Sequence, residues 1–75
     1  MNLSELKIGE TGRIIGLKAG EKYYRQKLLS MGLVPGTEVK IARVAPLGDP
    51  IELAVRGYAL SLRRDEASIL QVEKV

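Results

Sequence analysis

The periodicity of the apolar residues changes once in the middle of the chain, and that change limits the possible folds. Residues 21–31 are good helix formers without an internal Gly or Pro, and Glu21 suits the positive start of a helix dipole. Gly32 follows the last apolar residue, where a left-handed residue usually ends a helix. Pro35-Gly36 then fits a type II turn, because Pro fixes φ at the second position and Gly supplies positive φ at the third. From Thr37 the apolar period is two, so the sequence predicts a helix that leads through a tight turn into a strand.

Alternation of apolar and polar residues predicts the strands, and Gly and Pro mark the connections between them. The expected strands cover residues 13–17, 37–45, 51–56, 58–63 and 69–73, with short helical turns at 3–6 and 64–68. Strict alternation stops at Ala42–Ala45, which favours a bulge or a strongly curved strand there. Pro46-Leu47-Gly48-Asp49-Pro50 is predicted to be a loop, since two prolines this close do not both fit a central strand.

Five short strands with one helix after the first favour a small barrel, because closing the sheet protects edges that an open sheet exposes. The expected fold class is mainly β, a small SH3-like barrel of about five strands with one inserted α-helix. A chain of 75 residues cannot divide its small core, so one domain over residues 1–75 is expected. The barrel is predicted to be filled by the alternating apolar residues Val39, Ile41, Leu53, Val55, Leu60, Leu62 and Val72.

Composition argues against several classes of function. The chain has no His and no Cys, so the commonest general base and the strongest nucleophile are absent, and no enzymatic activity is expected. Only scattered Asp and Glu remain as metal ligands, so neither a cofactor nor a specific metal site is expected. Asp65 and Glu66 are interpreted as part of a solvated helical turn. The glycines at 9, 12, 16 and 20 lack the ending of a P-loop and are interpreted as turn residues, so no small-molecule ligand is expected.

Nucleic-acid binding is the main alternative, since small β-barrels often bind strands through basic grooves and stacked aromatic rings. The net charge is +3, and Arg63-Arg64 with Lys40 and Arg43 could form a basic patch, although scattered basic residues more often belong to a solvated face. The three tyrosines are the only aromatic residues, which also argues against a groove for Pro-rich peptides. No apolar segment approaches the ~20 residues that span a bilayer, so a cytoplasmic protein without membrane insertion is expected.

Three segments resemble the FeoA family, the ferrous iron transport protein A. They are Leu3–Glu10, the signature Arg25–Gly36, and Arg43–Ile51, and the last two in fixed order are the more specific part. The residues that form this structural motif are Gly32, Pro35, Gly36, Pro46, Gly48, Asp49 and Pro50.

The resemblance implies an SH3-like fold without enzymatic activity and a partner, the iron transporter FeoB. It implies that the chain binds the cytoplasmic GTP-binding region of FeoB, modulates the assembly or activity of the transporter, and is recruited through it to the inner face of the cell membrane. SH3-like modules resembling FeoA also occur at the end of iron-dependent repressors. A regulator-type module for protein interaction therefore stays open beside the nucleic-acid alternative.

The predicted helix carries more apolar residues than one buried stripe can hold. At about 100° per residue, Tyr24, Leu28 and Met31 form a stripe that can face the barrel, while Tyr23 and Leu29 fall outside it. One of these two could instead cover the rim of the barrel, because single exposed apolar residues are common. An apolar centre with a polar rim is typical of specific interfaces. The residues expected to contact a partner are Tyr23, Lys27, Leu28 and Leu29, with Leu28 at the edge of the stripe and Lys27 on the rim.

Overall fold

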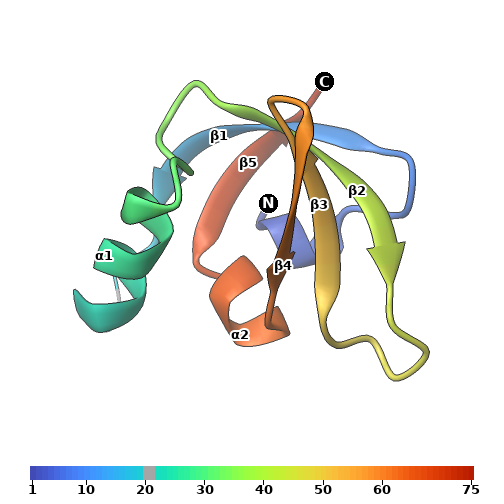
Figure 1. Cartoon of the computed structure of the whole chain (residues 1–75). Helices are drawn as coiled ribbons and strands as arrows, with labels where there is room; N and C mark the ends of the chain where they lie inside the picture. The colour runs from blue at the N-terminus through green and yellow to red at the C-terminus, as the bar shows by residue number, and fades with distance from the viewer. Residues whose placement is uncertain (20–21) are drawn as a thin grey trace.

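The computed structural model describes residues 1–19 and 22–75, and within them five strands form one curled antiparallel sheet (Figure 1). The elements are η1 (Leu3–Glu5), β1 (Thr11–Leu17), α1 (Lys22–Ser30), β2 (Glu38–Val44), β3 (Ile51–Val55), β4 (Tyr58–Leu62), α2 (Arg64–Ala67) and β5 (Leu70–Lys74). The strand order is β4-β3-β2-β1-β5, so β1 pairs with both β2 and β5. The predicted five strands with a helix after the first are confirmed. Glu21, the predicted start of that helix, lies outside the described residues.

The core lies inside the curled sheet and takes alternate residues from each strand. Six of the seven predicted interior residues are buried, and Leu60 is the exception because it is only partly buried. Leu60 belongs to β4, an outer strand of the sheet, in which Leu62, next to α2, is buried. The buried apolar residues are Leu3, Leu6, Ile14, Leu28, Leu33, Val39, Ile41, Ile51, Leu53, Val55, Leu62, Ala67, Leu70 and Val72.

Two strand irregularities let the sheet bend. The register of β2 against β3 shifts between Ile41 and Arg43, which confirms the bulge predicted from Ala42 onward. A second shift, between Ile14 and Gly16 of β1, was not predicted. β3 and β4 are joined by a two-residue turn at Arg56-Gly57, where both residues have positive φ, 49° and 85°. This is the turn geometry that matches the twist of a hairpin.

Gly12 lies inside β1, so its interpretation as a turn residue is wrong, and the same holds for Gly16. A Cβ at Gly12 would lie 2.8 Å from Leu6 Cδ1 and 3.3 Å from Val72 Cβ. Glycine is therefore needed at this position because Leu6, next to η1, and β5 both approach the backbone closely. Gly20 lies outside the described residues.

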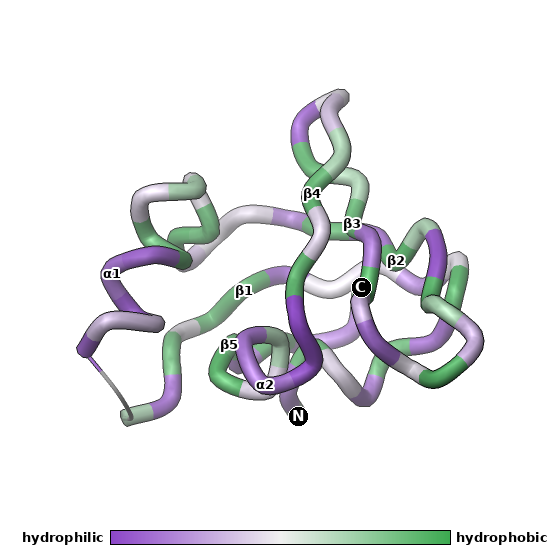
Figure 2. The backbone as a smooth tube through the Cα atoms, turned by 60° about the horizontal axis from the view of Figure 1, so that its bottom comes forward, coloured by the Kyte–Doolittle hydropathy of each residue, from purple (hydrophilic) through white to green (hydrophobic). Residues whose placement is uncertain are grey.

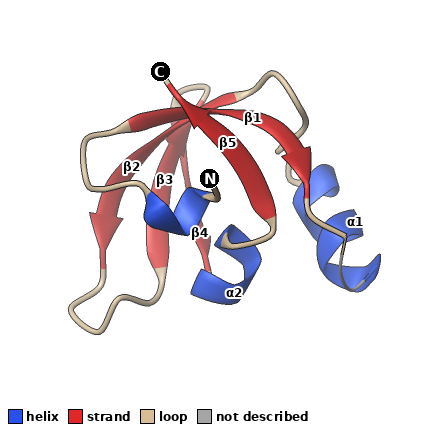
Figure 3. Cartoon of the chain, turned by 180° about the vertical axis from the view of Figure 1, so that it is seen from behind, coloured by secondary structure: helices blue, strands red, loops and turns tan. Residues whose placement is uncertain are grey.

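The outer edge of β5 is covered by the first residues of the chain (Figure 3). Asn2 forms a bridge with Gln71, and the Val72 N–H donates to the Met1 carbonyl at 2.9 Å. The other outer strand, β4, has no such cover among the residues that the structure describes.

α1 ends as the sequence predicts. Gly32 has φ 85°, the Gly32 N–H donates to the Leu29 carbonyl at 3.0 Å, and the Leu33 N–H donates to the Leu28 carbonyl at 3.1 Å. These bonds form a Schellman-type cap that satisfies the last carbonyls of the helix. The turn at Pro35-Gly36 follows, with Gly36 at φ 94° and the Thr37 N–H donating to the Val34 carbonyl at 3.1 Å.

Replacing Gly32 by alanine is expected to lower the free energy of unfolding by about 1 to 2 kcal/mol, because positive φ crowds a Cβ against the following carbonyl. The new Cβ would also lie 3.0 Å from Nη1 of Arg56. Thermal and urea unfolding followed by circular dichroism measure the effect. Gly16→Ala is the matched control, since a Cβ there meets no atom within 4 Å. Equal unfolding midpoints for Gly32→Ala and the wild type would contradict this account of the cap.

Candidate protein-interaction surface

α1 lies beside the barrel and is attached to it by apolar residues near its C-terminal end (Figure 1). Its first turns are hydrophilic, and a hydrophobic stretch follows towards the connection to β2 (Figure 2). Leu28 and Leu33 are fully buried, while Tyr24 and Met31 are partly buried. The predicted inward stripe of Tyr24, Leu28 and Met31 is therefore confirmed.

Burial divides the four residues predicted to contact a partner. Tyr23 is 67% exposed and Leu29 is 40% exposed, as the helical arc predicted. Leu28 is 0% exposed, so its placement at the edge of a contact surface is wrong. Leu28 is the fully buried residue of α1, because its side chain attaches the helix to the barrel. We call the remaining residues Tyr23, Lys27 and Leu29 the α1 surface.

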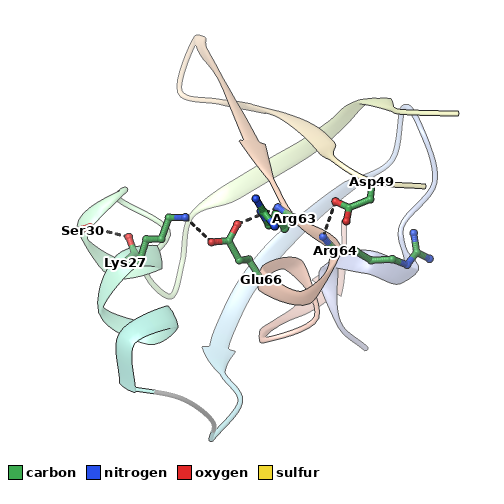
Figure 4. A network of polar contacts seen from close by, with 6 residues as sticks. All are labelled: Lys27, Ser30, Asp49, Arg63, Arg64 and Glu66. Carbon is green, nitrogen blue, oxygen red and sulfur yellow. Dashed lines mark hydrogen bonds and ion pairs between the residues drawn. The ribbon is translucent and has the colours of Figure 1, made fainter. Parts of the chain in front are cut away.

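The Lys27 ammonium pairs with Glu66 of α2, which is far from Lys27 in the sequence (Figure 4). The distance from Lys27 Nζ to Glu66 Oε2 is 2.6 Å, and Glu66 is 2% exposed. The interpretation of Glu66 as a solvated residue is therefore wrong. Its other oxygen, Oε1, accepts the Arg63 N–H at 2.9 Å and so caps α2. The N-cap residue is Arg63 rather than Ser or Thr, so the sequence lacks the usual capping-box pattern that would have marked Glu66.

Burial alone would raise the pKa of Glu66, but the hydrogen bonds from Lys27 and from the Arg63 N–H outweigh burial and leave that pKa below its usual range. The same contact raises the pKa of Lys27, because its hydrogen bond to Glu66 favours the charged ammonium. Arg63 lies close enough to oppose this rise in the pKa of Lys27 by repulsion between like charges. The buried carboxylate of Glu66 is therefore held by one ion pair, with Lys27, and by one backbone N–H, that of Arg63.

Polar contacts continue from α2 to the loop between β2 and β3 (Figure 4). The Arg64 N–H donates to Asp49 Oδ1 at 3.1 Å, and Arg64 Nη1 donates to the Gly48 carbonyl at 3.1 Å. Within the loop, the Gly48 N–H donates to the Ala45 carbonyl at 2.7 Å, and the Asp49–Pro50 peptide is cis. Leu47, between Pro46 and Gly48, is 96% exposed. Gly48 and Asp49 of the structural motif thus hold a defined loop against α2.

The tip of the β3–β4 hairpin holds the segment after α1. The Tyr58 hydroxyl donates to the Met31 carbonyl at 3.2 Å, and Arg56 Nη2 donates to Thr37 Oγ1 at 3.0 Å. Tyr58 is 44% exposed, so it adds apolar surface next to this connection. Tertiary contacts, which the sequence did not reveal, therefore fix both ends of the segment from Lys27 to Thr37.

Other kinds of site were sought in the same described ranges, 1–19 and 22–75. No group of three or more Asp or Glu residues is placed to hold a metal ion there, and no pocket is found. None of the helices described is long and apolar enough to cross a membrane. Of the residues considered for a basic patch, Arg63 and Arg64 lie at the start of α2, whereas Lys40 and Arg43 lie on β2.

A model of the FeoA domain matches residues 1–74 of the chain. Over all 75 residues the chain is 36% identical to a fusion protein of Porphyromonas gingivalis that combines Fe(2+) transport protein A with the Fe(2+) transporter FeoB. The chain spans 9% of the length of that relative.

Solved structures agree with this match. An NMR structure of a FeoA-like protein from Clostridium acetobutylicum is 44% identical, with a TM-score of 0.91 over 100% of this chain and 86% of that one. A crystal structure of FeoA from Stenotrophomonas maltophilia, described as a prokaryotic SH3 domain protein, is 26% identical. It has a TM-score of 0.84 and covers 97% of this chain and 89% of that one. The predicted SH3-like fold is confirmed.

Proposed function

The chain belongs to the FeoA family of ferrous iron transport, and on that premise we propose that it is a non-enzymatic accessory protein of ferrous iron uptake. In this proposal it binds the cytoplasmic GTP-binding region of the transporter FeoB and modulates the assembly or the activity of FeoB. It acts in the cytoplasm and is recruited by FeoB to the inner face of the cell membrane.

The fusion protein of Porphyromonas gingivalis is the observation that carries this proposal. A fusion keeps two domains at a high effective concentration, which favours an interaction between them even where the affinity is modest. The proposal extends that association to this chain.

The α1 surface supports the proposal because it exposes apolar side chains about 120° apart around the helix, on either side of the buried stripe. Tyr23 and Leu29 present apolar side chains to solvent, and Lys27 lies between them in the sequence with its ammonium tied to Glu66. Aromatic and aliphatic groups inside a polar rim are the residues that usually carry binding energy. The helix that bears them is fixed by the buried Leu28 and by its C-terminal cap, so little order would have to be created on binding.

Leu29→Glu is expected to weaken binding of the soluble GTP-binding region of FeoB by about tenfold or more, because a charge in an apolar contact loses its hydration on binding. Pull-down and calorimetry in the presence of GDP or of a GTP analogue measure this affinity and its dependence on nucleotide. Ferrous iron uptake in cells is expected to fall in parallel.

Ile8→Glu is the matched control for this variant. Ile8 is 62% exposed and belongs to the connection between η1 and β1, on the opposite side of the molecule from α1 (Figure 1). It should bind as the wild type does. Circular dichroism and thermal melting must first show that both variants fold. Full binding by a folded Leu29→Glu variant would place the interface away from the α1 surface, and no binding by the wild type in any nucleotide state would refute the proposed partner.

A further inference from the structure

The outer edge of β4 leaves backbone hydrogen-bonding groups unused. Val55 and Tyr58 close the two-residue turn, so they form a hydrogen-bonded pair, and such pairs alternate along the hairpin. The N–H and C=O groups of Leu60 and Leu62 therefore point towards β3, while those of Ala59 and Ser61 point away from it. No hydrogen bond to these outward groups is formed by any residue in the described part of the chain.

Nothing in the sequence of β4 protects this edge. Strand edges are usually blunted by a charged residue, a proline, a bulge or a covering segment. The sequence Tyr-Ala-Leu-Ser-Leu contains neither a charged residue nor a proline, and both register shifts of the sheet lie in other strand pairs. Ala59 and Ser61 are small and exposed, so their side chains leave access to the backbone. The edge of β5, by contrast, is covered by the first two residues of the chain.

Basic residues flank β4 at both ends. Arg56 precedes it in the turn, and Arg63 and Arg64 follow it. Arg63 lies near Lys27, whose ammonium pairs with Glu66, whereas Arg63 contacts that carboxylate through its backbone N–H. The acidic residue beside β4 on the sheet is Glu52, opposite Ser61, and Glu52 is itself opposed by Arg43 on β2. The acidic residues at the end that follows β4 are Asp65, Glu66, which pairs with Lys27, and Asp49, which accepts the Arg64 N–H. The guanidinium groups of Arg56, Arg63 and Arg64 form no ion pair within the described residues, so they are available to the carboxylates of a partner, and the centre of the edge is neutral.

This charge pattern selects the kind of strand that can be added. Two copies of β4 in antiparallel pairing would bring the arginine that precedes one strand towards the two that follow the other, and like charges repel. An extended segment with acidic residues at both ends would instead place carboxylates next to these arginines. Strand addition needs no pocket, because main-chain hydrogen bonds supply the affinity.

We propose that the β4 edge is a second interaction surface, which binds an extended acidic segment of a partner protein as an additional strand of the sheet. Ala59 and Ser61 form the new ladder of hydrogen bonds, and Arg56 and Arg63 bind carboxylates at its two ends. The proposal is independent of which protein supplies the segment and of the α1 surface.

The test uses the whole chain, labelled with nitrogen-15, and the synthetic peptide Glu-Glu-Val-Thr-Val-Thr-Val-Glu-Glu. Addition of the peptide is expected to shift the amide signals of Ala59 and Ser61 most and to slow their hydrogen exchange. The same peptide with Lys in place of every Glu should bind about tenfold more weakly or worse. Two N-methylated peptides are compared, one methylated at the odd residues and one at the even residues. Each lacks the N–H donors along one side of the strand, and only the peptide that lacks those facing β4 should fail to bind.

Two pairs of variants separate the contribution of the backbone hydrogen bonds to peptide affinity from that of the charged side chains. Ser61→Pro removes an outward N–H while leaving the bonds to β3, and it should lose about tenfold or more in affinity, whereas Ser61→Ala should bind normally. Arg63→Glu should weaken binding to a similar extent, whereas Lys40→Glu, the same charge change on β2, should change it little. If Ser61→Pro proves unstable, the Arg63→Glu and N-methylation experiments still decide the matter.

Three results would overturn the proposal. They are a wild type without amide shifts at about 1 mM peptide, shifts confined to α1, or unchanged affinity in a folded Ser61→Pro variant. Since the test contains no transporter protein, none of these results bears on the proposed function.

Discussion

Replacing Leu53 by alanine is expected to lower the free energy of unfolding by roughly 2 to 5 kcal/mol, the largest loss from any single truncation considered. Leu53 is fully buried in the middle of β3, with Ile41 opposite it on β2 and Leu60 opposite it on β4. The missing isopropyl group would leave a cavity at the centre of the barrel. A small domain without a disulfide is typically stable by only about 5 to 15 kcal/mol, so the variant would lose a large share of its stability.

Leu60→Ala is the matched control, because the same atoms are removed from the neighbouring strand where the side chain is only partly buried. It should cost clearly less than Leu53→Ala, since the cost of truncation follows the burial of the deleted atoms. Urea unfolding followed by circular dichroism gives both values. A cost at Leu60 equal to or above that at Leu53 would show that the interior of the barrel is packed differently.

The second large effect is expected at Glu66, where alanine should cost about 2 kcal/mol. The substitution removes the acceptor of the Arg63 N–H and the partner of Lys27 together. Glu66→Gln separates these contributions, because its amide oxygen can still cap α2 while the charge is lost. Its stability should therefore lie between those of the wild type and Glu66→Ala.

The contribution of Glu66 should also depend on pH in a defined direction. Its pKa is lower in the folded chain than in the unfolded chain, so the ionised carboxylate stabilises the fold above its usual pKa range. That stabilisation is lost as the pH falls through the lowered folded-state pKa. The difference in melting temperature between the wild type and Glu66→Gln should be largest near neutral pH and should shrink below about pH 4. A difference that grows on acidification would contradict the lowered pKa.

Local periodicity was sufficient to predict most of the fold. Alternation identified β3 and β4 and the faces of Leu53 and Val55, because each strand has one face in the core and one towards solvent. The loss of alternation at Ala42 located the bulge in β2 for the same reason. Gly32 identified the end of α1, since few residues other than glycine accept its positive φ.

Features that depend on how distant segments meet were not predictable in this way. Leu60 alternates as well as Leu53 and Leu62 do, but only the packing of the folded chain shows that it is partly buried while the other two are fully buried. In the sequence Glu66 resembles a solvated acidic residue, and only the folded chain shows that Lys27 of α1 lies against it. The helical arc separated the exposed Leu29 from the buried stripe, yet it could not show that Leu28 is withdrawn completely from solvent.

The position of β1 between β2 and β5 has a consequence for the order of folding. The β3–β4 hairpin closes through a two-residue turn, whereas the pairing of Gly12 with Lys74 joins opposite ends of the chain. Closing a long loop costs more conformational entropy than closing a short one, so it becomes favourable only when other contacts already hold the chain together. The hairpin can therefore form early, and the β1–β5 pairing completes the barrel late, on the timescale of milliseconds to seconds that is typical of small β-barrels.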